Sequence, residues 1–299
     1  AMAAPRGEAR RVVVTDVDGT LMDSSHRLPA ANRLALQRCL AAGVPVVLAT
    51  GKHRGPWVAS LLAEVVGSGN APDAHGLGEL RAASAWTLNA PGVFVQGLLV
   101  CDASGRIVRQ ITLDPGVVRM CSDAAQARGW TLLAYADGDR VLCNRADPRT
   151  DMLRPLQEPQ VEVAPVGDTA VYKMIVVTTP AEESAVRAEL ADLVGAAASL
   201  TVAIAGLVEI LPRGASKADG AAAALELLGL DVSEALALGD GENDLELLQL
   251  VRDAGGDAVA VGNARRVLKD VATEVVASCD DAGWAEAVER HVLGPARVR

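Results

Sequence analysis

Strand-length apolar segments alternate with helix-length segments in the N-terminal part of the chain, and this alternation most constrains the fold. Residues 11–15 and 44–49 have the β-branched apolar composition of buried strands. Residues 29–42 and 57–66 have the apolar spacing of helices. Because parallel strands need a crossover, which is usually a helix, the pattern predicts a parallel sheet with helices on both faces.

The last third of the chain repeats this alternation. The expected elements are a helix at 217–228, a strand at 235–238, a helix at 245–251, a strand at 258–261, a helix at 264–272, a strand at 274–277 and a helix at 282–292. The two ends of the chain therefore predict one α/β layer, a Rossmann-like parallel sheet that is split in the sequence.

The middle of the chain has the pattern of paired strands. Two hairpins are predicted, one with strands at 92–100 and 107–113 and one with strands at 130–136 and 140–144. Further strands are expected at 171–178 and 200–204, around a helix at 180–194. We therefore predict a parallel core at 9–96 and 206–299 that is interrupted by an α+β domain at 97–205.

Two aspartates, Asp16 and Asp18, follow the first predicted strand in the segment Asp-Val-Asp-Gly-Thr. Open α/β sheets bind ligands at the carboxyl ends of their strands, and Gly19 allows a tight turn away from the sheet. One carboxylate in such a pair can attack and the other can move a proton. The alternative is a solvated Asp-Gly turn.

A second acidic segment, Gly-Asp-Gly-Glu-Asn-Asp, follows the predicted strand at 235–238 and begins at Gly239. Together with Asp16 and Asp18, Asp240 would form an all-oxygen cluster suited to Mg²⁺. A calcium loop is the competing interpretation, but the segment lacks the spacing of an EF-hand and its glutamate at loop position twelve.

Two weaker signals accompany these acidic segments. Thr50 and Gly51 close the predicted strand at 44–49, where a hydroxyl and a backbone N–H can hold a phosphate oxygen. Lys217 begins a predicted helix and can add positive charge to an end that already favours anions. A plain turn and a surface lysine are the alternatives.

Taken in order, the DVDGT segment, Thr50, Lys217 and the GDGEND segment resemble the four motifs of the haloacid dehalogenase (HAD) superfamily. The second aspartate of the first motif, Asp18, resembles the aspartate found in the phosphatase branch of this superfamily and not in its dehalogenases. The large α+β insert between Thr50 and Lys217 resembles the C2 cap of the Cof-type subfamily, HAD-IIB. The resemblance extends over about residues 12–292 and includes the segment AVAVGNA that begins at Ala258.

The resemblance implies a Mg²⁺-dependent phosphatase that works through an aspartyl-phosphate. Asp16 would be the nucleophile, and Asp18 would protonate the leaving alcohol and then activate water. Asp16, the backbone carbonyl of Asp18 and Asp240 would hold Mg²⁺, and Asp244 would support them. The phosphoryl oxygens would be held by Thr50, Gly51, Lys217, Asn243 and the N–H groups of Val17 and Asp18.

Some positions depart from the family pattern. Gln96-Gly97 stands where the family often has Asn-Gly before the cap, and Lys52 follows Thr50-Gly51 where arginine is common. Lysine keeps the charge but loses the bidentate fork. In the cap, Lys173 resembles a family lysine, and either packing or substrate contact would explain it. His53 and Arg54 lie just after Thr50-Gly51, where contact with a substrate is an alternative to the surface or capping role expected for the histidines.

Charge and cysteine usage limit the partners and the compartment. The formal net charge is −10 and aromatic residues make up 2%, which disfavours nucleic acid. No apolar run reaches membrane-spanning length. The five cysteines are odd in number and lack CxxC spacing, which favours reduced thiols in cytoplasm or an organelle. The Ala/Arg-rich first eleven residues are compatible with an expression scar or the remnant of a plastid transit peptide.

The leading expectation is a phosphatase for a small metabolite, such as a sugar phosphate, pyridoxal phosphate or a flavin-type phosphate. A phosphomutase and a non-catalytic HAD-fold binding or regulatory protein are the alternatives. A monomer or a homodimer is expected, without a membrane partner.

Overall fold

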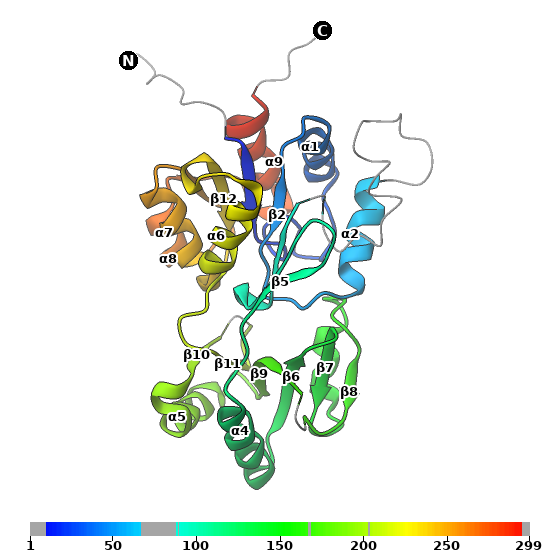
Figure 1. Cartoon of the computed structure of the whole chain (residues 1–299), viewed down its shortest axis with the longest axis vertical. Helices are drawn as coiled ribbons and strands as arrows, with labels where there is room; N and C mark the ends of the chain where they lie inside the picture. The colour runs from blue at the N-terminus through cyan, green and yellow to red at the C-terminus, as the bar shows by residue number, and fades with distance from the viewer. Residues whose placement is uncertain (1–9, 67–87, 89, 167–168, 203, 295–299) are drawn as a thin grey trace.

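The computed structural model describes residues 10–66, 88, 90–166, 169–202 and 204–294. Its described residues form two layered units, one above the other in Figure 1, and both ends of the described chain lie on the upper unit, away from the lower one. Most of the Ala/Arg-rich first eleven residues lie outside the described part of the chain.

The upper unit is a five-stranded parallel sheet in the order β14-β13-β12-β1-β2. The strands are β1 (Val12–Thr15), β2 (Val46–Leu48), β12 (Ala235–Gly239), β13 (Asp257–Ala260) and β14 (Glu274–Val275). Strands β1 and β12 are fully buried, as expected for strands covered on both faces. The predicted parallel core is confirmed, and Thr15 pairs with Leu238, so the segments after β1 and β12 leave the sheet at one edge.

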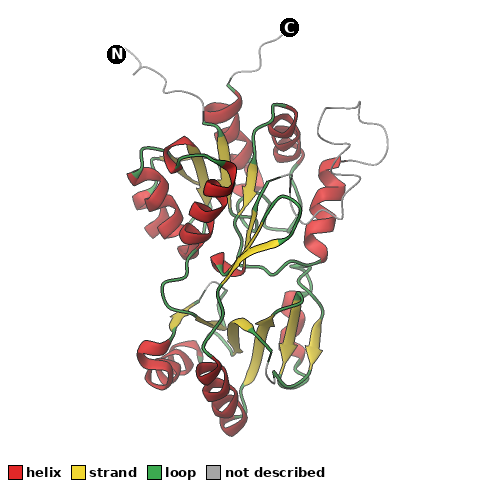
Figure 2. Ribbon diagram, viewed as in Figure 1, coloured by secondary structure: helices red, strands yellow, loops and turns green. Residues whose placement is uncertain are grey.

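Helices cover both sides of this sheet (Figures 1 and 2). They are α1 (Ala30–Ala41), α2 (Pro56–Val66), α6 (Lys217–Leu228), α7 (Leu245–Asp253), α8 (Arg266–Val271) and α9 (Gly283–Val288), the last followed by a π turn at Glu289–Leu293. Helices α6, α7 and α8 lie on one side in Figure 1, and α1 and α2 lie on the other. The indole N–H of Trp284 on α9 donates to the hydroxyl of Thr15, which ties α9 to the end of β1.

The lower unit, the cap, is a six-stranded sheet in the order β10-β11-β9-β6-β7-β8. Its strands are β6 (Thr131–Ala136), β7 (Arg140–Cys143), β8 (Val161–Val163), β9 (Val171–Val177), β10 (Ser199–Thr201) and β11 (Leu207–Leu211). Only the β7–β8 pair is parallel. Helices α4 (Pro115–Arg128) and α5 (Glu183–Val194) pack on the face away from the core (Figure 1).

Alternation along the cap strands decides which side chains face the core. On β9, Met174 and Val176 join the apolar cluster under α4 and α5. The alternate residues Lys173 and Ile175 point toward the core unit, because successive side chains of a strand lie on opposite faces. By the same rule Tyr135 on β6 and Glu209 on β11 share the core-facing side.

A small third sheet joins the two units. Its antiparallel strands are β3 (Gly92–Phe94), β4 (Leu99–Cys101) and β5 (Ile107–Gln110), and Val93 also bridges to Ala49 beyond β2. The predicted single strand at 92–100 is wrong: Val95 and Gln96 have φ values of 51° and 61° and a 3₁₀ turn, Val95–Gly97, divides it. Three cap elements, α4, β8 and β11, have no counterpart among the sequence predictions.

Strand β11 lies in the cap sheet beside β9 and β10, whereas the β4–β5 hairpin adjoins the core. The boundaries expected from the sequence, 97 and 205, fall before this hairpin and before β11. We propose that the inserted domain runs from the end of β5 to the end of β11.

Gly97 lies where the chain crosses closest to the start of α6. A Cβ on Gly97 would lie 2.0 Å from Ser216 O, and φ is +88°. We expect Gly97→Ala to lower the free energy of unfolding by about 2–5 kcal/mol, measured by urea denaturation. Gly43→Ala is the matched control: φ is +70° and no atom lies within 4 Å, so backbone strain alone should cost about 1 kcal/mol. Equal losses in the two variants would contradict the steric argument.

Candidate active site

Asp16 and Asp240 lie side by side at the carboxyl edge of the core sheet. Asp16 follows β1, and its N–H donates to Leu238 O of β12 at 3.0 Å. Asp240 follows β12 directly, and the hydroxyl of Thr20 donates to Asp240 Oδ1 at 3.1 Å. Asp16 is 6% exposed, so its carboxylate is largely withdrawn from water. The structure thus brings together two residues that are 224 positions apart, as the sequence pattern predicted.

Lys217 lies against this pair from the first residue of α6. Ser216 caps the helix by accepting from the Asp219 N–H. Lys217 Nζ lies 2.5 Å from Asp16 Oδ1 and 2.7 Å from Asp244 Oδ1. Burial by itself would lower the pKa of Lys217, but the two carboxylates outweigh burial and raise that pKa. Lys217 is therefore a buried, permanently charged ammonium group between two acids.

Asp244 holds the turn that carries Asp240. Its Oδ2 accepts from the N–H groups of Asp240 and Gly241, each at 3.0 Å, while its Oδ1 binds Lys217. A Cβ on Gly239 would lie 2.5 Å from Asp244 Cβ, so glycine is needed for this approach. We therefore propose that Asp244 positions Asp240, in keeping with the supporting role that the family resemblance implies.

The carboxylates fit a hard divalent cation. Asp16, Asp240 and Asp244 each place an oxygen within 4.8 Å of the others. Both oxygens of Asp244 are already engaged, which leaves Asp16 and Asp240 as the side chains to ligate an ion. Burial raises the pKa of Asp240 to about 6, with a further contribution from Asp244. Burial likewise raises the pKa of Asp16, against the opposing charge of Lys217. An oxygen-only set with excess negative charge suits Mg²⁺.

Asp18 is held by two basic side chains. Lys52 Nζ lies 2.8 Å from Asp18 Oδ1, and His26 Nδ1 lies 3.1 Å from the same oxygen and donates to it. Burial works to raise the pKa of Asp18, but the hydrogen bond from His26 and the charge of Lys52 lower it overall. The sequence marked Lys52 only as a departure from the family pattern and gave His26 no role in the site.

Thr50, Gly51 and Asn243 border the same space. Thr50 Oγ1 accepts from the Lys52 N–H at 3.1 Å and retains its own hydroxyl proton for donation. Asn243 Nδ2 donates to Gln96 Oε1 at 3.0 Å. Gln96 Nε2 in turn lies 3.5 Å from Glu209 Oε2. The longer amide of Gln96 therefore connects a core motif to the cap.

A cavity of about 320 Å³ lies between the core and the cap. Its core side includes Asp16, Asp18, Thr50, Gly51, Lys52, Gln96, Asp240 and Asn243, and its cap side includes Tyr135, Leu153, Leu156, Glu158, Lys173, Ile175, Ile204, Leu207 and Glu209. Val17, Lys217 and Asp244 are buried behind the core wall. A larger cavity of about 550 Å³ shares only Leu153 and Glu158 with this one and contains none of the predicted site residues.

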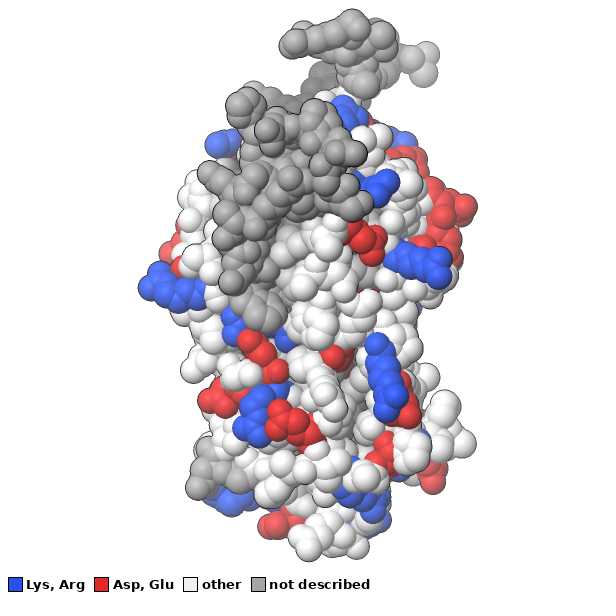
Figure 3. Space-filling view, turned by 90° about the vertical axis from the view of Figure 1, so that its right-hand side faces the viewer, with Lys and Arg blue, Asp and Glu red and all other residues white. Residues whose placement is uncertain are grey.

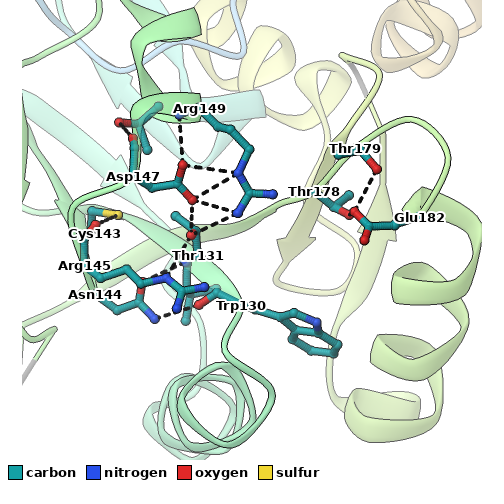
Figure 4. Close-up of polar contacts among 12 residues, drawn as sticks. Trp130, Thr131, Cys143, Asn144, Arg145, Asp147, Arg149, Thr178, Thr179 and Glu182 are labelled. Atoms are coloured by element: carbon teal, nitrogen blue, oxygen red, sulfur yellow. Dashed lines mark hydrogen bonds and ion pairs between the residues drawn. The ribbon is translucent and has the colours of Figure 1, made fainter.

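The cap wall includes residues that the sequence did not single out, notably Glu158 and Glu209. Glu158 lies on the segment between β7 and β8 and accepts from the Tyr135 hydroxyl and the His53 N–H, each at 3.1 Å. In the sequence, Asp147-Pro148 at the start of this segment is a dipeptide typical of turns and was the signal that could have indicated it. The start is anchored by Asp147, which accepts from Arg149 and Thr131 (Figure 4).

His53 and Arg54 do not line the site cavity. His53 Nδ1 accepts from the Arg54 N–H, so Nε2 carries the proton and donates to Ala136 O in the cap at 2.9 Å. Arg54 Nε donates to Asp139 Oδ1 at 2.8 Å. Both side chains therefore connect the loop after β2 to the cap.

Residues 13–60 and 80–288 match the family of haloacid dehalogenase-like hydrolases. The HMP-PP phosphatase of Yersinia pestis is 24% identical over 292 residues, which cover 95% of this chain and 96% of that protein. The Arabidopsis thaliana protein "Endoribonuclease YBEY, chloroplastic" is 33% identical over 290 residues, covering 94% of this chain but only 46% of the relative.

Solved structures agree with the fold. A haloacid dehalogenase-like hydrolase from Bacteroides thetaiotaomicron superposes with a TM-score of 0.77 at 25% identity, covering 94% of this chain and 99% of that one. The chain therefore belongs to the haloacid dehalogenase-like hydrolase family. Among the described residues, no helix has both the length and the apolar character required to cross a membrane.

Proposed function

We propose that this chain hydrolyses a phosphate monoester of a small metabolite, with Mg²⁺ as cofactor and an aspartyl-phosphate as intermediate. The observation that carries the proposal is the buried Asp16–Lys217–Asp244 arrangement beside Asp240 at the carboxyl edge of the sheet. The narrower substrate candidates, a sugar phosphate, pyridoxal phosphate or a flavin-type phosphate, remain part of this proposal.

In the first half-reaction, a carboxylate oxygen of Asp16 attacks the phosphorus atom. The bond from phosphorus to the ester oxygen breaks, and the leaving alkoxide takes a proton from Asp18. In the second half-reaction, Asp18 accepts a proton from water as the water oxygen attacks phosphorus. Asp16 then leaves as a carboxylate and inorganic phosphate is released.

The chain's own groups offset the charge that this reaction gathers. Lys217 stabilises the negative charge around Asp16, and Thr50 and Asn243 are placed to donate to phosphoryl oxygens. Mg²⁺ bound by Asp16, Asp240 and the carbonyl of Asp18 would supply further positive charge toward the phosphoryl group.

Asp18 needs a proton before it can act as an acid. Its contacts with Lys52 and His26 lower its pKa in the ligand-free structure. A dianionic phosphate placed beside Asp18 favours the neutral acid, because like charges raise a carboxyl pKa. We therefore propose that substrate binding itself promotes protonation of Asp18.

The test is phosphate release from p-nitrophenyl phosphate and from metabolite phosphates, with Mg²⁺ or with excess EDTA. We expect release only with Mg²⁺, and borohydride added during turnover should reduce the acyl phosphate and label Asp16, as read by peptide mass spectrometry. Release that persists in EDTA, or turnover without a label at Asp16, would contradict the proposal.

The same assay separates the alternatives. A phosphomutase would return phosphate to an organic acceptor instead of releasing it, and a binding protein would do neither.

The expectation of no nucleic-acid partner stays a prediction; Figure 3 shows basic and acidic side chains interspersed on one face. The five cysteines are buried and unpaired, which supports the proposal of a reducing compartment.

A further inference from the structure

The lining of the site cavity is acidic, and its cations already have partners. Lys173 Nζ lies 3.1 Å from Glu209 Oε1 and donates to Gly51 O at 3.1 Å. Lys52 Nζ is paired with Asp18 at 2.8 Å. Lys173 and Lys52 are the only lysines or arginines in the described lining, and the histidine there, His26, is also engaged, with Asp18.

Acidic side chains outnumber these two lysines around the cavity. The lining contains six of them: Asp16, Asp18, Asp23, Glu158, Glu209 and Asp240. Lys217 and a bound divalent cation act at the core end, where the reacting phosphoryl group belongs. A second anionic group on a ligand would therefore meet carboxylates at the cap end.

From this arrangement we infer that Glu158 and Glu209 select monoesters whose leaving group is neutral or cationic and donates hydrogen bonds, and that they reject leaving groups with a second anionic group. The inference rests on the proposed phosphatase function and specifies its substrate class. The carboxylates act as acceptors for hydroxyl or ammonium donors, and an additional phosphate or carboxylate would be repelled.

The environment of Glu158 supports this inference. Each carboxylate oxygen accepts one hydrogen bond, from the Tyr135 hydroxyl and the His53 N–H. Burial nevertheless raises the pKa of Glu158 to about 7, despite the charges of Lys173 and Lys52. A hydroxyl or ammonium donor on a ligand would therefore stabilise the carboxylate form of Glu158, which predominates above pH 7.

The remainder of the cap wall is aliphatic. Leu153 and Leu156 come from the segment between β7 and β8, Ile175 and Leu207 from the core-facing side of the cap sheet, and Ile204 from the loop before β11. Such a wall suits one apolar face of the leaving group. The volume of about 320 Å³ is near the lower end of the roughly 300–1,000 Å³ of small-molecule sites, which favours a compact leaving group.

The test uses pairs of substrates that differ in charge far from the phosphate. Glucosamine 6-phosphate is compared with glucose 6-phosphate, and sorbitol 6-phosphate with 6-phosphogluconate. Each is assayed for kcat/KM and as a competitive inhibitor of p-nitrophenyl phosphate hydrolysis. We expect 6-phosphogluconate to have a kcat/KM at least about tenfold lower than that of sorbitol 6-phosphate, and to inhibit at least about tenfold more weakly, because like charges placed together are strongly unfavourable. The ammonium compound should equal or exceed glucose 6-phosphate.

Variants assign the effect to the two glutamates. Glu158→Gln and Glu209→Gln should each reduce the neutral-to-anionic ratio at least about threefold, as expected for a lost acidic acceptor. Glu162→Gln is the matched control: Glu162 lies on β8, is paired with Arg140 and is absent from the cavity lining, so the ratio should not change. Because Glu209 pairs with Lys173, the Glu158 variant keeps the test valid if the Glu209 variant does not fold.

The outcomes distinguish failure of this inference from failure of the proposed phosphatase function. Mg²⁺-dependent hydrolysis of p-nitrophenyl phosphate with equal inhibition across the charge series would overturn this inference alone. So would hydrolysis that none of the four compounds inhibits, or a change of ratio in Glu162→Gln as large as in Glu158→Gln. No hydrolysis of any phosphate would overturn the proposed function and the inference together.

Discussion

Asp16→Asn is expected to reduce kcat by at least about 10⁴-fold, the scale seen when a covalent nucleophile is removed. The amide keeps the size of the side chain but lacks the negative charge and the nucleophilic oxygen. The substitution also gives Lys217 and a bound Mg²⁺ a neutral amide oxygen in place of a charged carboxylate. These losses act on the same step, and steady-state phosphate release with saturating Mg²⁺ measures them together.

Folding has to be separated from chemistry in this variant. Asp16 is buried between Lys217 and the like charges of Asp240 and Asp244, and its pKa is raised. Replacing it with a neutral amide removes like-charge repulsion, so the apo variant should unfold at a urea concentration similar to or higher than that of the wild type. A folded Asp16→Asn variant that retains a tenth of the wild-type rate would exclude Asp16 as the nucleophile.

Lys217→Met is expected to lower the free energy of unfolding by about 3–5 kcal/mol in EDTA at pH 7, because it leaves two buried carboxylates facing one another. Lys217 is 1% exposed and Asp244 is 0% exposed, so water cannot replace the lost ammonium group. Turnover should also fall by at least about 10²-fold, since a preorganised positive charge is removed from the reacting group. Urea denaturation and phosphate release measure the two effects.

The pH dependence of this variant has a definite sign. The pKa of Asp16 is already raised by burial in the folded state, and loss of the Lys217 charge, which opposes that shift, raises it further. A raised carboxyl pKa makes folding take up protons, so the stability of Lys217→Met should increase as the pH falls from 7 to 5, relative to wild type. Lys217→Met combined with Asp244→Asn should recover part of the loss at pH 7. If the loss of stability in Lys217→Met does not depend on pH, and the double variant recovers none of it, the interaction of Lys217 with Asp16 and Asp244 does not contribute as described.

The sequence was most informative where chemistry is tied to strand ends. Asp16 and Asp240 follow apolar strands, and parallel pairing brings those ends to one edge, so their proximity could be predicted without coordinates. Helix α4 was missed although it carries clear end signals: Asp114 caps it, Pro115 is its first residue and Gly129 follows in the left-handed conformation. Its apolar residues are interrupted by polar ones, which weakens the periodic signal.

The cap wall was not predictable in the same way. Tyr135, Lys173 and Glu209 lie on three different strands and become neighbours through antiparallel register. No local spacing indicates that register, and a strand shifted by one residue would turn each of these side chains toward α4 and α5. Glu158 depends in addition on a loop whose course is set by contacts with the core, where Trp57 N–H donates to Gln157 O.

The short loop after Thr50 makes contacts on both sides of the cavity, and this bears on how phosphate leaves. Gly51 O accepts from Lys173, and His53 donates to Ala136 O in the cap. Rotation of the cap away from the core would have to break these two hydrogen bonds, which lie next to Thr50 in the chain. If the proposed function holds, opening of the cap and release of phosphate would therefore be coupled through one stretch of backbone.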